Sequence, residues 1–274
     1  MSKTLAASVR RLSLGVLVAG AMAPFLAADD PPIEVNPNRP TFATPALTTQ
    51  SGVVEVEFGL EHTDLRDGGD LSYSPFLLKL GLLKHLELRV GGNGLLHTDP
   101  AEGPSETGYG DTTVGAQWCY WPKGPLGIDE SVQVTWKAPT ASLGKGLGSG
   151  ASDLLAMLLL SRDMSAFHVD VNALVNWLGR STGESRDAQP AAAVSVSRTL
   201  SDHWSVTGEI YSISHTAQNA FVLSNLWAVG YKASTRLVLD AGIDAGLSHG
   251  APKISFFSGL TYGVCRFRHP GHGD

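Results

Sequence analysis

The feature that most constrains this chain is a period-two alternation of apolar and polar residues, repeated in many separate segments. Each segment runs for about 9 to 12 residues, the length of a β-strand that crosses a membrane at a tilt. The clearest is 167–178, where Val169 and Val171 alternate with Asp170. Thirty-one glycines and 15 prolines supply the turns between such segments. The pattern predicts an all-β fold.

About twelve strands can be placed along the chain. They are expected at residues 53–62, 73–80, 86–95, 112–121, 131–139, 153–161, 167–178, 191–199, 203–214, 221–232, 236–247 and 253–267. The segment 153–161 is apolar on both faces, so a buried helix is an alternative there. An even number of strands places both ends of a closed barrel on one side of a membrane.

The connections alternate in length. The short ones include residues 81–85, 200–202 and 233–235. The long ones are rich in Gly, Ser, Asp and Glu and lie at 63–71, 97–111, 140–152 and 179–190. This asymmetry is typical of an outer-membrane barrel, which has turns at its periplasmic rim and loops outside.

A soluble secreted β-sandwich is the main alternative, because its strands also alternate, with the apolar face inward. Strand length and turn asymmetry favour the membrane barrel, since soluble strands average about 5 to 6 residues. An interfacial girdle is also indicated by aromatic residues near the ends of the apolar stripes: Trp118, Tyr120, Trp136, Trp177, Trp204, Trp227 and Tyr262. We therefore expect a closed antiparallel transmembrane β-barrel.

The first 28 residues have the plan of a secretory signal peptide. Three cations precede an apolar run at residues 12–26, which ends in Ala27 and Ala28 before two aspartates. The run is shorter than the ~20 residues that a spanning helix needs, so a retained anchor is the weaker alternative. The leader predicts export and a final location in the outer membrane of a double-membraned bacterium.

The remaining chain divides into three parts. Residues 29–52 contain several prolines and no periodicity, so they are either a plug inside the barrel or a disordered periplasmic segment. Residues 53–267 form the expected barrel, and 268–274 form a C-terminal tail. The expected partners are outer-membrane lipid, a small-molecule solute and the barrel-assembly machinery.

The charge pattern excludes a nucleic-acid partner, because the formal net charge is −6 and no run of Lys and Arg compensates locally. We expect no metal and no cofactor. The inward faces of the strands carry the candidate lumen-lining residues, which either fill a narrow barrel with an ionic network or select passing solutes. They are Glu55, Glu57, Lys79, Glu87, Arg89, Gln117, Lys137, Asp170, Asn172, Glu209, Asp240 and Asp244.

Short motifs along the chain resemble a known family. Asn-Arg-Pro-Thr-Phe at 38–42 and the glycine-led strand at 51–59 are similar to the opening of the outer-membrane barrel family assigned to transport in the MetA pathway of phenol degradation. Further similar stretches follow in order at residues 77–89, 110–117 and 137–140. The resemblance implies a transport barrel for aromatic or other apolar small molecules, without catalytic residues.

Three functions remain open at this stage. We expect a non-enzymatic channel for passive passage of small molecules, including apolar or aromatic ones. A non-conducting structural or adhesive barrel is the second possibility. The third is an acyl-ester hydrolase, because His203, Ser205 and Glu209 share one face of a strand and Ser214 lies at its other end.

Overall fold

The computed structural model describes residues 31–180, 183, 186–214 and 221–268. The chain divides into two units, Met1–Pro31 and Pro32–Asp274, and the strands of the described residues lie in the second. The predicted signal peptide and residues 269–274 of the predicted tail lie outside the described residues. Within the described ranges, no helix is long and apolar enough to span a membrane.

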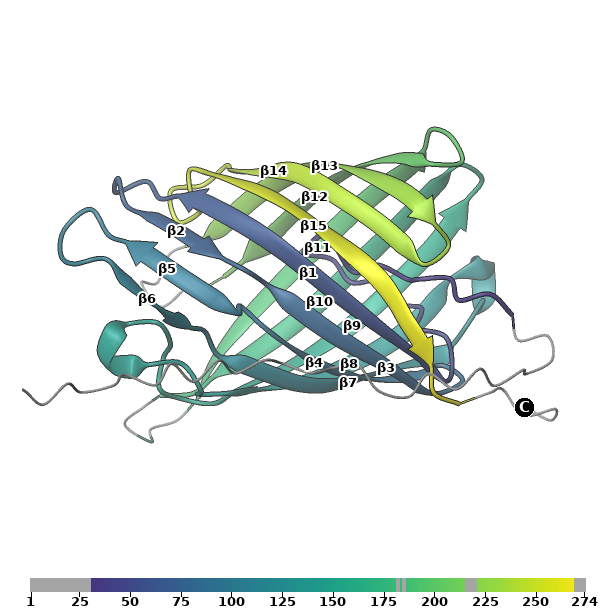
Figure 1. Cartoon of the computed structure of the whole chain (residues 1–274), viewed down its shortest axis with the longest axis horizontal. Helices are drawn as coiled ribbons and strands as arrows, with labels where there is room; N and C mark the ends of the chain where they lie inside the picture. The colour runs from purple at the N-terminus through teal and green to yellow at the C-terminus, as the bar shows by residue number, and fades with distance from the viewer. Residues whose placement is uncertain (1–30, 181–182, 184–185, 215–220, 269–274) are drawn as a thin grey trace, which may run out of the picture. The chain divides into compact units, whose positions relative to one another are not determined.

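The strands of the second unit form a closed antiparallel barrel (Figure 1). Twelve strands make its wall, as predicted. They are β1 (Val53–Asp64), β3 (Phe76–Leu83), β4 (Leu86–Gly92), β7 (Thr112–Trp121), β8 (Asp129–Ala138), β9 (Asp153–Met164), β10 (Phe167–Leu178), β11 (Asp187–Thr199), β12 (Trp204–Ile213), β13 (Val222–Ser234), β14 (Leu237–Gly246) and β15 (Ile254–Arg266). Pairing of β15 with β1 closes the ring and leaves neither strand with an open edge.

Three short strands extend the wall at the end that carries the long connections. They are β2 (Asp70–Tyr73), β5 (Leu95–Asp99) and β6 (Glu106–Tyr109). They occupy parts of two segments that the sequence predicts as loops, because β2 pairs with β1 and β5 pairs with β6. The predicted strands at 73–80 and 86–95 are therefore interrupted. Pro75 has no N–H for the ladder, and Gly94 has a positive φ of 59°.

The burial pattern of the wall is the reverse of a soluble protein's. On β1, Phe58 is 46% exposed on the outer face while the neighbouring Glu57 is 3% exposed on the inner face. The same inversion holds on β10, where Val171 is outward and exposed and both Asp170 and Asn172 are buried. Apolar side chains thus face outward, which a soluble sandwich does not do.

The segment at 153–161, for which the sequence left a buried helix as an alternative, forms strand β9. Its inward residues Met157 and Leu159 are buried against Ala46 of the N-terminal segment, with Leu174 of β10 packed beside them. An apolar inner face is needed here because the lumen contains protein at this level instead of water.

Candidate functional site: the barrel lumen

Residues 32–52, called the N-terminal segment below, lie inside the ring of strands and are coloured purple in Figure 1. The segment starts at the short-turn rim, where Val35 N–H donates to Thr235 O at 3.0 Å. It reaches an apex near Phe42, then returns to the same rim, where Gly52 N–H donates to Gly81 O at 2.7 Å. The segment therefore enters the lumen from the short-turn rim, turns back near Phe42 and returns to the same rim, so it fills the half of the lumen next to that rim.

Inward-facing carboxylates hold this segment through its backbone. Glu57 accepts the N–H groups of Asn38 and Arg39 at 2.8 and 3.1 Å. Glu209 accepts those of Phe42 and Ala43 at 2.8 and 2.6 Å. Because these bonds reach the main chain, they satisfy a stretch of irregular backbone that has no secondary structure of its own.

The returning arm is held in the same way, by residues of β10 and β4. Asn172 binds Thr44 twice, accepting its N–H at 2.6 Å and donating to its carbonyl at 3.0 Å. Glu87 accepts the N–H of Thr49 at 2.6 Å. Both arms of the segment are therefore fixed by side chains of the wall.

Arg39 anchors the segment by charge. Its guanidinium donates to both oxygens of Asp240 on β14, at 3.2 and 3.0 Å. A Cβ atom on Gly59 or on Gly259 would overlap this guanidinium, and the two glycines are directly opposite each other on β1 and β15. Glycine at both positions leaves the space that Arg39 occupies.

A buried ion cluster lies where β1 and β3 pair. Lys79 Nζ is 3.1 Å from Glu55 and 2.8 Å from Glu57, and all three side chains are almost completely buried. The ammonium also donates to the carbonyl of Asn36 in the N-terminal segment. The cluster therefore joins the wall to the segment, and its charges are paired as burial requires.

The other predicted lining residues fall into smaller groups. Arg89 donates to Glu87 at 2.8 Å and to the Oε1 of Gln117 at 2.7 Å. Lys137 lies 2.6 Å from Asp153 and 3.4 Å from Asp111.

The two remaining aspartates of the predicted set bind hydroxyl groups. Asp170 accepts from Ser161 at 2.5 Å and from Ser195 at 3.2 Å. Asp244 accepts from Tyr211 at 2.5 Å. The twelve candidates are thus spread around the whole inner wall, and most of them contact the segment or another candidate.

Sequence reasoning missed the residues that complete the contact with the segment. Ser161 Oγ accepts the N–H of Ala46 at 2.7 Å, and Ser131 Oγ donates to the carbonyl of Ala46. Phe42 stacks on Tyr211 with ring centroids 4.6 Å apart. The inward parity of Ser131 and Ser161 was a usable signal, but small hydroxyl side chains are common on any polar face.

The residues considered for ester hydrolysis are not arranged as a catalytic pair. His203 Nδ1 is 2.8 Å from the backbone carbonyl of Lys232, and no hydrogen bond joins it to Ser205 in the described residues. Glu209 is used by the N-terminal segment. Ser214 donates to the carbonyl of Pro190 at 2.7 Å, and the neighbouring His215 lies outside the described residues.

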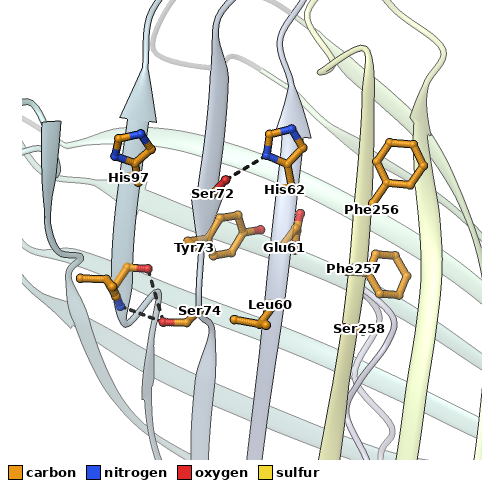
Figure 2. A pocket seen from close by; sticks show the side chains of 11 residues that line it. Leu60, Glu61, His62, Ser72, Tyr73, Ser74, His97, Phe256, Phe257 and Ser258 are labelled. Atoms are coloured by element: carbon orange, nitrogen blue, oxygen red, sulfur yellow. Dashed lines mark hydrogen bonds between the residues drawn. The ribbon is translucent and has the colours of Figure 1, made fainter. Parts of the chain in front are cut away.

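The outer wall has a shallow hollow where β1, β2, β5 and β15 meet, shown in Figure 2. Its outward side chains include Leu60, His62 and Phe256, and His62 Nδ1 is 2.9 Å from Ser72 Oγ. Tyr73 and Glu61 point toward each other in the same view. By strand register both belong to the inner face.

Comparisons with known proteins place this geometry in a family. The family model described as "Putative MetA-pathway of phenol degradation" matches residues 38–263. The chain belongs to this family. The match begins at Asn38, inside the N-terminal segment, so family membership covers that segment from Asn38 onward as well as the wall. A comparison with curated proteins found no match.

Solved structures share the fold. The COG4313 outer membrane channel from Pseudomonas putida F1 superposes with a TM-score of 0.62 at 13% identity, covering 84% of this chain and 100% of that one. The KdgM porin in complex with disordered oligogalacturonate gives a TM-score of 0.54 at 10% identity, covering 77% and 99%. Both are similar to this chain as outer-membrane barrels.

Proposed function

We propose that this protein is an outer-membrane channel for passive passage of small molecules, apolar and aromatic ones included. In this role the N-terminal segment, residues 32–52, is the part of the predicted plug at 29–52 that occupies the short-turn half of the lumen in the resting state. The observation that carries the proposal is a closed barrel with an apolar outside and a charged inside, whose lumen holds a segment bound mainly through its backbone. Such a segment can leave without breaking the wall.

The charged lining has two roles in this proposal. While the segment is bound, Glu57, Glu209 and Asn172 accept its N–H groups. When it leaves, the same groups face water and set the sign of the lining, which is how rings of charged side chains select solutes. The family description supports aromatic solutes as the class to test first.

The location follows from the same proposal. The predicted signal peptide at residues 1–28 directs export, the barrel-assembly machinery inserts the strands, and lipid surrounds the exposed apolar face of the wall. The protein then acts without nucleotide or metal, as a conduit driven by the solute gradient.

Planar-bilayer conductance tests the proposal. The full mature chain, residues 29–274 after removal of the predicted signal peptide, is expected to conduct weakly. A variant that also lacks residues 29–52 is expected to conduct more. A double-cysteine variant tests the same point without a deletion. It carries Ala46→Cys and Ser161→Cys in a background where the free Cys119 and Cys265 are replaced by serine. The disulfide should hold conductance low until a reductant is added.

The matched control carries Ala46→Cys alone in the same background, and its conductance should not respond to reductant. If neither the full chain nor the deleted variant conducts ions or speeds uptake of aromatic solutes, the channel proposal is wrong. A structural barrel would then be the better account, because a filled lumen serves it equally well.

A further inference from the structure

The lumen also contains a cavity beside the N-terminal segment, lined partly by residues 38–42 of the segment and partly by the wall. The cavity, of about 360 Å³, lies between the apex of the N-terminal segment and the end of the barrel that carries the long connections. We call it the upper chamber. Its size is at the lower end of the range of small-molecule sites, enough for a single ring with a short substituent.

Aromatic side chains line the upper chamber. Phe42, at the apex of the segment, stacks on Tyr211 of β12 with an interplanar angle of 10°. Tyr73 and Phe257 come from β2 and β15. Three of these rings belong to the wall and one to the segment, and together they offer apolar surface to a ligand.

Three carboxylates line the chamber, of which Glu57 is paired with Lys79, while Glu61 and Asp244 lie among the rings. Strand register places Glu61 directly opposite both Tyr73 and Phe257, so the carboxylate is between two aromatic side chains on the inner face (Figure 2). Asp244 accepts hydrogen bonds from Tyr211 and Ser224. Each carboxylate is therefore oriented by neighbouring groups.

Neither Glu61 nor Asp244 has a cation of its own. In the described part of the chain, no Lys or Arg nitrogen lies within ion-pair distance of Glu61 or Asp244, whereas Arg39 is paired with Asp240 and Lys79 with Glu55 and Glu57. Arg39 and Glu57 also line the chamber, but they are paired with Asp240 and Lys79, so Glu61 and Asp244 leave a net negative charge beside the aromatic side chains. That combination attracts a cation that also carries an apolar surface.

We propose that the upper chamber is a binding site for a small organic cation that joins an ammonium group to an apolar ring. The ammonium lies between Glu61 and Asp244, and the ring packs on Phe42 and Tyr211. This deepens the proposed function, on which it rests for the route of the ligand, by naming the class of solute that the channel holds best. Binding itself does not require conduction.

Calorimetric titration of the full mature chain in detergent tests the site with three probes of one shape. Benzylamine is a cation at neutral pH, benzyl alcohol is neutral and benzoate is an anion. Benzylamine is expected to bind about tenfold more tightly than benzyl alcohol because it adds a charge in a partly desolvated site, and benzoate should bind most weakly. Equal affinities of benzylamine and benzyl alcohol, or no binding of benzylamine, overturn the proposal.

Variants locate the site. Asp244→Asn and Glu61→Gln should each weaken benzylamine about tenfold and leave benzyl alcohol within about twofold, because only the charge is removed. Phe42→Leu should weaken both probes. The matched control is Asp153→Asn, a lumen carboxylate paired with Lys137 outside the chamber, which should change neither affinity. Unchanged benzylamine affinity in both carboxylate variants contradicts the assignment.

The outcomes separate this site from the channel. If the chain binds benzylamine but never conducts, the channel proposal is wrong and the binding-site proposal stands. If the chain conducts but does not bind benzylamine, the binding-site proposal is wrong and the channel proposal stands. Retention of the folded barrel in each variant is checked by its resistance to unfolding in unheated detergent gels, so that a lost affinity is not read from an unfolded chain.

Discussion

Arg39 and Asp240 are 201 residues apart in the sequence and form a two-point ion pair inside the barrel, with nitrogen–oxygen distances of 3.2 and 3.0 Å. The pair links the N-terminal segment to β14, and Asp240 is almost fully buried. This ion pair anchors the segment near its apex, in addition to the hydrogen bonds that its backbone makes to the wall. Its loss should therefore affect both stability and conduction.

Arg39→Met leaves the carboxylate of Asp240 buried without its cation. We expect the bound state of the segment to lose about 3 kcal/mol, the scale for breaking a buried pair, and open-channel events in planar bilayers to become more frequent. Lys232→Met is the control, since the Lys232–Glu34 pair also joins the segment to the wall but is exposed and should contribute less than about 1 kcal/mol. Equal effects of the two variants would argue against Arg39 as the anchor.

Gly59→Val should displace the N-terminal segment without removing any charge, because the three heavy atoms nearest to a Cβ at this position all belong to the guanidinium of Arg39. The expected result is higher conductance and faster proteolysis of the segment in a folded barrel. Gly144→Ala is the control, because no heavy atom lies within 4 Å of a Cβ at Gly144. A segment that stays protected from protease in Gly59→Val would show that the Arg39 side chain can move aside at little energetic cost.

Lys79→Met removes the only cation that the described structure places within ion-pair distance of Glu55 and Glu57. Two buried carboxylates would then face each other unpaired, so we expect the free energy of unfolding to fall by about 3 to 5 kcal/mol in urea titrations. Lys145→Met, in an exposed pair with Glu106, should change it by less than about 1 kcal/mol. A small effect at Lys79 would mean that water reaches the cluster.

Val171→Lys tests the direction in which the wall faces. Val171 is exposed on the outer face of β10, midway along the strand, so the charge would enter hydrocarbon and should cost about 2 to 4 kcal/mol of unfolding free energy in lipid vesicles. Met164→Lys, at the end of β9 beside a turn, should cost about 0 to 1 kcal/mol because the penalty falls toward the interface. Equal tolerance at both positions would contradict a lipid-facing wall.

Much of the wall could be read from the chain because strand alternation is a local property. The bounds of β7 and β10 agree with prediction, and Lys79 pairs with Glu55 and Glu57, which the alternation places with it on the inner face. The breaks at Pro75 and Gly94 were missed, because whether a strand continues past such a residue depends on its partner.

The lumen contents could not be predicted in the same way. The N-terminal segment has no periodicity, and both a plug and a free periplasmic segment were consistent with it. Its contacts lie far along the chain, such as Glu209 for Ala43 and Asn172 for Thr44. The apolar inner face of β9 is explained only by Ala46 packing against it.

By itself, the sequence determined an all-β chain whose strands are charged on one face and apolar on the other, because each strand's alternation needs only its own residues. Closure of the ring, the path of the N-terminal segment and the meeting of Glu61 with Asp244 in one chamber were decided by the tertiary structure. Those features depend on register between strands distant in sequence, which no single segment specifies.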